Sequence, residues 1–147
     1  HYVHLNAKSA FISTKVIAEH IAANQGGGVI LYLSSLHDEK PTGCAITYSA
    51  GKGAVKMLCR EMALFFGRKG VRANLIELDA IGDQAQELDS MISRFQYDAE
   101  TKIPLKRRLK PEDVPALVEF LLSDEASYIN GAEVRVDGGH LYYYIDR

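Results

Sequence analysis

The sequence has little of several features that define common classes of protein. Its 147 residues include 2 Cys, 4 Pro and no Trp. No apolar run approaches the roughly 20 residues of a membrane-spanning helix, and the N-terminus lacks the pattern of a signal peptide. The 17 Lys and Arg residues are balanced by 19 Asp and Glu, so there is no positive excess to bind phosphates. We therefore expect a cytoplasmic protein with neither nucleic acid nor membrane as a partner.

The two cysteines give no sign of a disulfide or a metal site. Cys44 and Cys59 lie far apart in the sequence, without the spacing of metal ligands. A chain with 47% hydrophobic residues can form a core without a covalent link. We expect reduced, structural thiols and no metal.

The hydrophobic pattern predicts helices and strands in alternation. Apolar residues that recur every three or four positions indicate helices, and continuous runs of β-forming residues indicate buried strands. The expected elements are helices over 3–23, 48–67 and from Pro111, and strands over 29–33, 71–78 and 133–136. This order predicts an α/β fold with three parallel strands, which is half of a doubly wound sheet.

The first residues indicate that the chain starts inside a domain. It begins with His1 instead of Met and enters a helical pattern at once. The most apolar strand, 29–33, has no earlier strand beside it, and an uncovered apolar edge favours aggregation. We expect residues 1–147 to form a single partial domain, with a further strand from preceding sequence or another chain paired to 29–33.

Tyr48 and Lys52 lie one turn apart on the second expected helix and therefore share a face. A cation near a phenol lowers the phenol pKa from about 10, so that proton transfer to a carbonyl oxygen becomes feasible near neutral pH. On spacing alone, a solvated helical pair is the simpler interpretation. Ser35 lies just after the C-terminal end of the predicted strand 29–33, where ligands bind in open α/β sheets, but its hydroxyl would equally satisfy loop backbone groups.

Together these motifs resemble the C-terminal half of the short-chain dehydrogenase/reductases. The matching pieces are LNAKSAF with Asn6, GGVILYLSS ending at Ser35, YSAGK from Tyr48 to Lys52, GVRANLI, and the segment from Lys110 to Gly139. The resemblance implies a Rossmann-like fold and hydride transfer between NAD or NADP and a small alcohol or carbonyl substrate. It also implies a homo-oligomer, dimer or tetramer, with Tyr142, Tyr143 and Tyr144 expected at a subunit contact.

The resemblance also implies roles for the site residues. Tyr48 would exchange a proton with the substrate oxygen, and Lys52 would hold the nicotinamide ribose and lower the pKa of Tyr48. Ser35 would donate a hydrogen bond to the substrate oxygen. Asn6 would hold a water in a proton relay, although the residue alone favours a polar side chain bonded to its own helix backbone. The neighbouring His37 is expected to be a solvated loop residue.

The chain departs from the family on the cofactor side. After the strand that corresponds to 71–78, the family usually has a Pro-Gly pair and, a few residues later, a Thr. At these positions this chain has Leu78-Asp79 and Asp83. Cofactor contacts are expected at Tyr48, Lys52, Leu78, Asp79, Ile81 and Asp83. Since Asp accepts a positive φ less freely than Gly, nicotinamide binding is expected to be altered. Alternatively, Asp79 and Asp83 cap a short helix.

A Gly-rich phosphate loop is also missing. Gly26-Gly27-Gly28 precedes a predicted strand instead of following one, so it indicates a turn and not a dinucleotide fingerprint. We expect an oxidoreductase for the parent protein and no activity for residues 1–147 alone. The alternative is a non-catalytic fragment or scaffold that serves oligomerisation without binding a cofactor.

Overall fold

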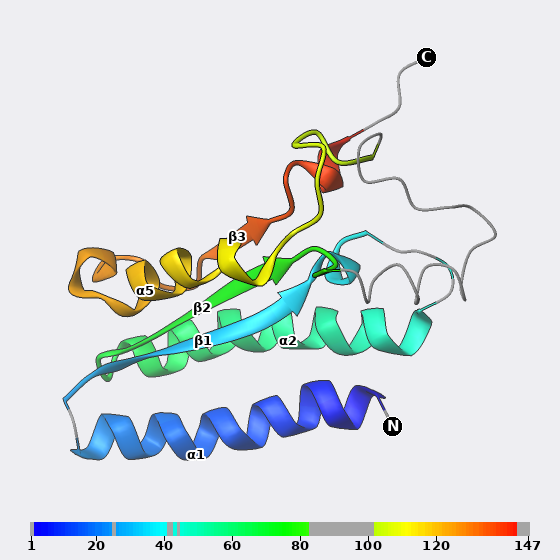
Figure 1. Ribbon diagram of the computed structural model, residues 1–147. Helices are drawn as coiled ribbons and strands as arrows, with labels where there is room; N and C mark the ends of the chain where they lie inside the picture. Colours follow the sequence, from blue (N-terminus) through cyan, green and yellow to red (C-terminus); the bar gives the residue numbers. More distant parts are fainter. Residues whose placement is uncertain (1, 25, 41–42, 44, 83–101, 144–147) are drawn as a thin grey trace.

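A three-stranded parallel sheet forms the centre of the fold. The computed structural model describes residues 2–24, 26–40, 43, 45–82 and 102–143. The strands lie in the order β1 (Gly28–Ser35), β2 (Val71–Leu78) and β3 (Glu133–Val136). Helices α1 (Ser9–Asn24) and α2 (Ile46–Gly67) cover one face, and α5 (Pro115–Leu122) lies on the other (Figure 1). The predicted α/β fold, its three strands and their parallel order are confirmed.

Short helical turns connect these elements. A π-helical turn, η1 (His4–Lys8), leads directly into α1, and a 3-10 turn, η2 (Leu36–Asp38), follows β1. Three more 3-10 turns are η3 (Pro111–Asp113), η4 (Asp124–Ala126) and η5 (His140–Tyr142). The turn η2 lies between the carboxyl end of β1 and the start of α2, and it therefore influences how these two elements approach each other.

Glycines at the amino ends of β1 and β2 fix their register. Gly28 pairs with Val71, and the Gly28 N–H donates to the Gly70 carbonyl at 3.1 Å. Gly70 has a φ of +78°, and a Cβ there would lie 2.8 Å from the Gly26 carbonyl oxygen. A side chain would therefore separate the two backbones. The glycine run before β1 is a turn that enters a strand, as predicted.

The core lies between the sheet and helices α1 and α2, and the buried face of α2 matches the predicted one only in part. Its buried residues are Gly51, Val55, Lys56, Cys59, Met62, Ala63 and Phe66. The apolar periodicity predicted Met57 and Phe65 on the inner face, yet they are 51% and 62% exposed. The same periodicity is confirmed at Met62 and Phe66, which are buried. It failed at Met57 and Phe65 because the buried face also takes in Gly51 and Lys56, which an apolar pattern does not mark. The prediction that Cys59 is a core residue is confirmed, since it is fully buried.

Helix α1 contacts the core through a narrow face. Thr14 and Ala18 are buried, whereas Phe11 and Ile17, predicted on the inner face, are about half exposed. The Tyr32 hydroxyl donates to Thr14 Oγ1 at 2.8 Å. Burial raises the pKa of Tyr32 to about 12, although this hydrogen bond acts to lower it. Despite the exposed apolar residues, no helix in the described ranges has the length and hydrophobicity to cross a membrane.

Strand β1 is an edge strand within the described residues. It pairs with β2 on one side, and Leu33 is 54% exposed. Leu33 points to the face opposite the buried Tyr32 and Ser34, so the expectation that this strand is buried on both faces is wrong at this residue. The expected pairing of a further strand with β1 stays a prediction.

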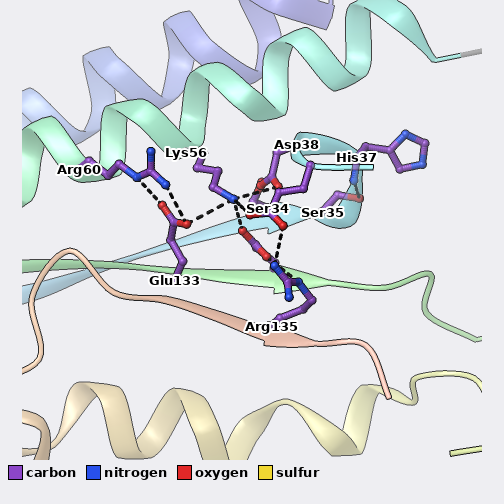
Figure 2. A network of polar contacts seen from close by, with 10 residues as sticks. Ser34, Ser35, His37, Asp38, Lys56, Arg60, Glu133 and Arg135 are labelled. Atoms are coloured by element: carbon purple, nitrogen blue, oxygen red, sulfur yellow. Dashed lines mark hydrogen bonds and ion pairs between the residues drawn. The ribbon is translucent and has the colours of Figure 1, made fainter. Parts of the chain in front are cut away.

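A network of charged side chains joins the sheet to α2 (Figure 2). We call it the Lys56 network, and its members are Asp38, Glu39, Lys56, Arg60, Glu77, Glu133 and Arg135. Lys56 is only 7% exposed, and its Nζ lies 2.6 Å from Glu77 Oε1 and 3.3 Å from Glu133 Oε2. Burial alone would raise the pKa of Glu133, but hydrogen bonds from Arg60 and Lys56 outweigh it and hold that pKa below its usual value. Glu133 is thus stabilised as a carboxylate in the folded protein.

Acid is expected to destabilise the protein through Glu133. Because its folded-state pKa lies below the unfolded value of about 4.3, its stabilising effect is complete above that pH and is lost as the pH falls through the folded-state pKa. The urea midpoint, measured from pH 7 to pH 3, should therefore fall less steeply for Glu133→Gln than for the native protein. Glu61→Gln, which alters an exposed carboxylate on α2, is the control and should follow the native curve. Equal slopes for native protein and Glu133→Gln would contradict the expectation.

Candidate active site

Tyr48 and Lys52 lie in the first two turns of α2, beside the carboxyl end of β1. Lys52 Nζ is 5.7 Å from the centroid of the Tyr48 ring and donates to the Leu33 carbonyl oxygen at 3.1 Å. Burial lowers the pKa of Lys52, and the Asp38 carboxylate opposes that change. The predicted one-turn spacing therefore brings a cation and a phenol together at the edge of the sheet where ligands bind in open α/β folds.

Residues 35–39, which are η2 with its two capping residues and which we call the Ser35 turn, contact this pair through His37. Ser35 Oγ accepts a hydrogen bond from the His37 N–H at 3.4 Å. The His37 ring packs edge-on against the Tyr48 ring, with centroids 5.2 Å apart, and His37 Nδ1 lies 3.4 Å from Ser49 Oγ. The expectation of a solvated His37 is wrong, because the ring is half-buried against α2. No spacing in the sequence signals a contact between this loop residue and the helix.

Asn6 lies in the π-helical turn η1, and such turns are frequent at functional sites. Its Nδ2 donates to the Tyr2 carbonyl oxygen at 3.0 Å, which is the local backbone bond that the residue alone favoured. The turn packs on Gly51, where a Cβ would lie 3.3 Å from Asn6 Cβ. Asn6 and Lys52 also line a groove of about 350 Å³ between α1, β1 and α2, although Ser35 and Tyr48 do not.

The residues expected on the cofactor side follow β2. Leu78 pairs with Ser35 across the sheet, so the end of β2 lies beside the Ser35 turn. Asp79 Oδ2 lies 2.9 Å from His140 Nδ1, and Asp79 Oδ1 accepts from the Ala80 N–H at 2.7 Å. The Asp79 carboxylate is therefore engaged with η5 and with its own backbone.

Asp79 does not need the left-handed conformation that favours Gly. Among the described residues, Lys106 alone combines a side chain with a positive φ. Replacement of the family's glycine by Asp79 thus adds no backbone strain. Ile81, 39% exposed, forms an isolated parallel bridge with Leu109. Asp83 lies outside the described residues, as does the short helix that Asp79 and Asp83 were alternatively expected to cap.

Two buried polar residues at the site were not predicted. Ser34 Oγ donates to Asp38 Oδ2 at 2.5 Å, and the Asp38 side chain is fully buried. The sequence pattern predicted Ser35 as a site residue and did not predict Ser34. Asp38, in a polar loop, has the sequence context of a solvated acid. The one signal for a polar cluster at this end of the sheet was Glu77, an acidic residue within an otherwise apolar part of β2.

The donor groups at Lys52 suit a ligand with hydroxyl groups. An ammonium has three N–H donors. Within the described part of the chain, Lys52 uses one of them for Leu33, so two remain for acceptors such as ribose hydroxyls. Tyr48 adds a hydroxyl that both donates and accepts. The Tyr48 and Lys52 side of the site therefore fits a nucleotide sugar beside a reacting carbonyl.

Comparison with known proteins identifies similar chains. A family model described as Enoyl-(Acyl carrier protein) reductase matches residues 1–140. Glucose 1-dehydrogenase 2 of Bacillus subtilis (strain 168) is 34% identical over 141 residues, which cover 96% of this chain and 54% of that protein. For 3beta-hydroxysteroid dehydrogenase 1 of Eggerthella lenta, identity is 31% with the same coverage of both chains.

Solved structures agree with these sequence matches. A gluconate 5-dehydrogenase from Burkholderia cenocepacia J2315, in complex with NADP and tartrate, superposes with a TM-score of 0.84 at 26% identity. The match covers 95% of this chain and 54% of that one. The chain spans about half the length of the curated relatives that it matches.

Two glycines of α2 test the close packing of the Asn6 turn. Gly53 has open space where a Cβ would lie, so Gly53→Ala should stabilise the protein by about 1 kcal/mol through helix propensity alone. Gly51→Ala makes the same local gain but presses on Asn6 and Tyr2, and overpacking of this kind costs about 1–3 kcal/mol. Urea unfolding should therefore rank Gly51→Ala below Gly53→Ala. Equal stabilisation by both substitutions would refute the close approach.

Proposed function

The chain belongs to the short-chain dehydrogenase/reductase family, a family of oxidoreductases, and from this membership we propose that its parent protein transfers a hydride between a nicotinamide cofactor and an alcohol or carbonyl substrate. The observation that carries the proposal is the placement of the Lys52 ammonium beside the Tyr48 ring at the carboxyl end of β1. Residues 1–147 supply the proton-transfer side of this site.

Tyr48 is the proposed general acid and base. Its hydroxyl gives a proton to the substrate oxygen during reduction and takes it back during oxidation. The Lys52 ammonium, 5.7 Å from the centroid of the Tyr48 ring, places a positive charge beside this phenol. The Leu33 carbonyl oxygen accepts a hydrogen bond from this ammonium, and within the part of the chain that the structure describes no carboxylate forms an ion pair with it.

Ser35 and Asn6 support the transfer. Ser35 donates a hydrogen bond to the substrate oxygen and stabilises the charge that develops there. Leu78, its partner across the sheet, bounds the site on the β2 side. Asn6 lies on the same groove as Lys52, which supports a role in conducting protons between that ammonium and water.

When bound, NAD or NADP supplies or accepts the hydride. Lys52 and Tyr48 would hold its ribose, and Leu78, Asp79, Ile81 and Asp83 would face its nicotinamide end. No feature of the described residues selects between the two cofactors. The substrate is a small molecule with an alcohol or carbonyl group, and the proposed assembly is a homo-oligomer.

One observation favours the alternative of a non-catalytic family member. The Asp79 side chain, at a position where the family usually has Gly, is drawn to His140 and brings a carboxylate to the cofactor side. Since its two oxygens are engaged with His140 and the Ala80 N–H, this carboxylate is less available to a cofactor. Cofactor binding therefore separates the two candidate functions.

Removal of one hydroxyl tests the catalytic proposal. In the protein expressed from its complete gene, Tyr48→Phe should lower kcat by about 10²–10⁴, because general acid catalysis contributes that much. Tyr32→Phe is the matched control, since it removes a buried hydroxyl whose hydrogen-bond partner is Thr14 of α1 and not a residue of the proposed site. This control should keep its kcat and lose about 1 kcal/mol of stability. Full activity of Tyr48→Phe would disprove the proposed role.

Binding measurements separate the enzyme from the non-catalytic alternative. Fluorescence titration of the same full protein with NADH and NADPH should detect binding of at least one. Lys52→Met should weaken it about ten- to hundredfold, because a hydrogen bond to a charged group is worth about 1.5–3 kcal/mol. Lys69→Met, at an exposed position after α2, should bind like the native protein. Absence of binding to either cofactor would favour the alternative.

A further inference from the structure

Three polar side chains form one row across the carboxyl end of the sheet. Ser34 of β1 pairs with Glu77 of β2, and Glu77 pairs with Arg135 of β3. Because residues in register on neighbouring strands point to the same face, this row faces α2. Lys56 meets it there, at 2.6 Å from Glu77 Oε1, and Arg135 Nε lies 3.0 Å from Glu77 Oε2. Glu77 is therefore bound by a cation on each side, although it is only 1% exposed.

The same cations hold the segment that follows Ser35. Lys56 forms an ion pair with Glu39 and lies 3.5 Å from Asp38 Oδ1, while Arg135 Nη2 lies 2.6 Å from Glu39 Oε2. Asp38 Oδ2 in turn accepts from Ser34, the residue before Ser35. The Ser35 turn is thus attached to α2 by Lys56 and to β3 by Arg135. Figure 2 shows the ion pairs of Lys56 meeting at its ammonium.

We propose that Lys56 and Asp38 are positioning residues, which set the Ser35 turn against the part of α2 that carries Tyr48 and Lys52. The inference rests on the proposed function, since it concerns the geometry of that site. Lys56 lies one helical turn after Lys52, so a contact that fixes Lys56 to the Ser35 turn also fixes the distance between the two catalytic segments.

Stability alone does not account for this arrangement. Well-packed apolar side chains can fill such a space without the cost of desolvating charged groups, and they are often as stable or more so. Asp38 illustrates this desolvation cost. Its Oδ1 is buried and accepts no hydrogen bond from the described residues, and it contacts Lys56 through an ion pair. The network instead fixes geometry, since its contacts form only when the Ser35 turn has one particular placement relative to α2 and β3.

Asp38 also links the network to Lys52 through its charge. The joined side chains are four acids and three bases, so one negative charge is in excess. Among the described residues, the charged or titratable groups around Lys52 are Tyr48 on α2, Asp38 on η2 and Tyr32 on β1, which lines the same groove. The residues of η1 and α1 that line this groove are uncharged. Since the Asp38 carboxylate raises the pKa of Lys52 against burial, removal of this charge should lower that pKa.

Asp38→Asn in the protein expressed from its complete gene tests the proposal. The amide keeps an oxygen acceptor for Ser34 and removes the charge, so the fold should survive. Lys56→Met is the stronger change, but it leaves four carboxylates without their shared ammonium and puts folding at risk. Arg60→Gln is the matched control, because Arg60 belongs to the same network yet contacts Glu133 and not the Ser35 turn.

Two readouts separate positioning from a general loss of stability. The side-chain NMR titration of Lys52, assigned by the signal that Lys52→Arg removes, should move to lower pH in Asp38→Asn and stay unchanged in Arg60→Gln. Steady-state kinetics should show kcat reduced about tenfold or more with KM unchanged, since displacement of a catalytic group costs up to about 10² in rate. The alkaline limb of the kcat profile should move with the Lys52 titration.

The outcomes distinguish this proposal from the proposed function. A native Lys52 titration and native kcat in Asp38→Asn would overturn the positioning role, as would an equal effect of Arg60→Gln. If the native protein has no oxidoreductase activity, the proposed function fails. The Lys52 titration then still decides whether Asp38 is coupled to Lys52, and an unchanged titration would overturn the inference.

Discussion

The ammonium of Lys56 is the group on which the arrangement of the chain depends. Four segments meet there: α2, the turn after β1, β2 and β3. Breaking a buried ion pair by removing one partner costs about 3–5 kcal/mol, because the other charge remains desolvated. The free energy of unfolding of a whole protein is only about 5–15 kcal/mol. Removal of the one ammonium that pairs with four carboxylates would therefore cost a large share of that free energy. The candidate site lies directly beside this group.

The sequence predicted the elements better than their contacts. The bounds of β2 and β3 match the expected 71–78 and 133–136, because runs of β-forming residues between glycine-rich turns leave little choice of boundary. The buried face of α2 was predicted only in part, because apolar periodicity ranks Met57 above Gly51 or Lys56, while the structure buries the latter two. A lysine enters the core only when partners from distant strands are present, and no local pattern reveals those partners.

In the site too, contacts within one helix were predictable from the sequence, and contacts between separate elements were not. Tyr48 and Lys52 were predictable together because helical geometry alone makes them neighbours. The edge contact of His37 with Tyr48 and the pairing of Asp79 with His140 join residues from separate elements. Such contacts depend on how η2 and η5 pack, which a single sequence does not specify. Asp83 belongs to residues that the structure does not describe, so its predicted role stays a prediction.

The parallel topology has a consequence for how the chain reaches this state. Gly28 pairs with Val71 and Leu75 with Glu133, so each ladder joins segments separated by at least one whole helix. Loop-closure entropy must be paid before either ladder forms its hydrogen bonds, which makes such sheets slow to fold. Helix α2 consists of contacts that are local in sequence and can form early. The carboxylates that surround Lys56 then assemble late, so the order in which the chain folds places the charged centre among its last steps.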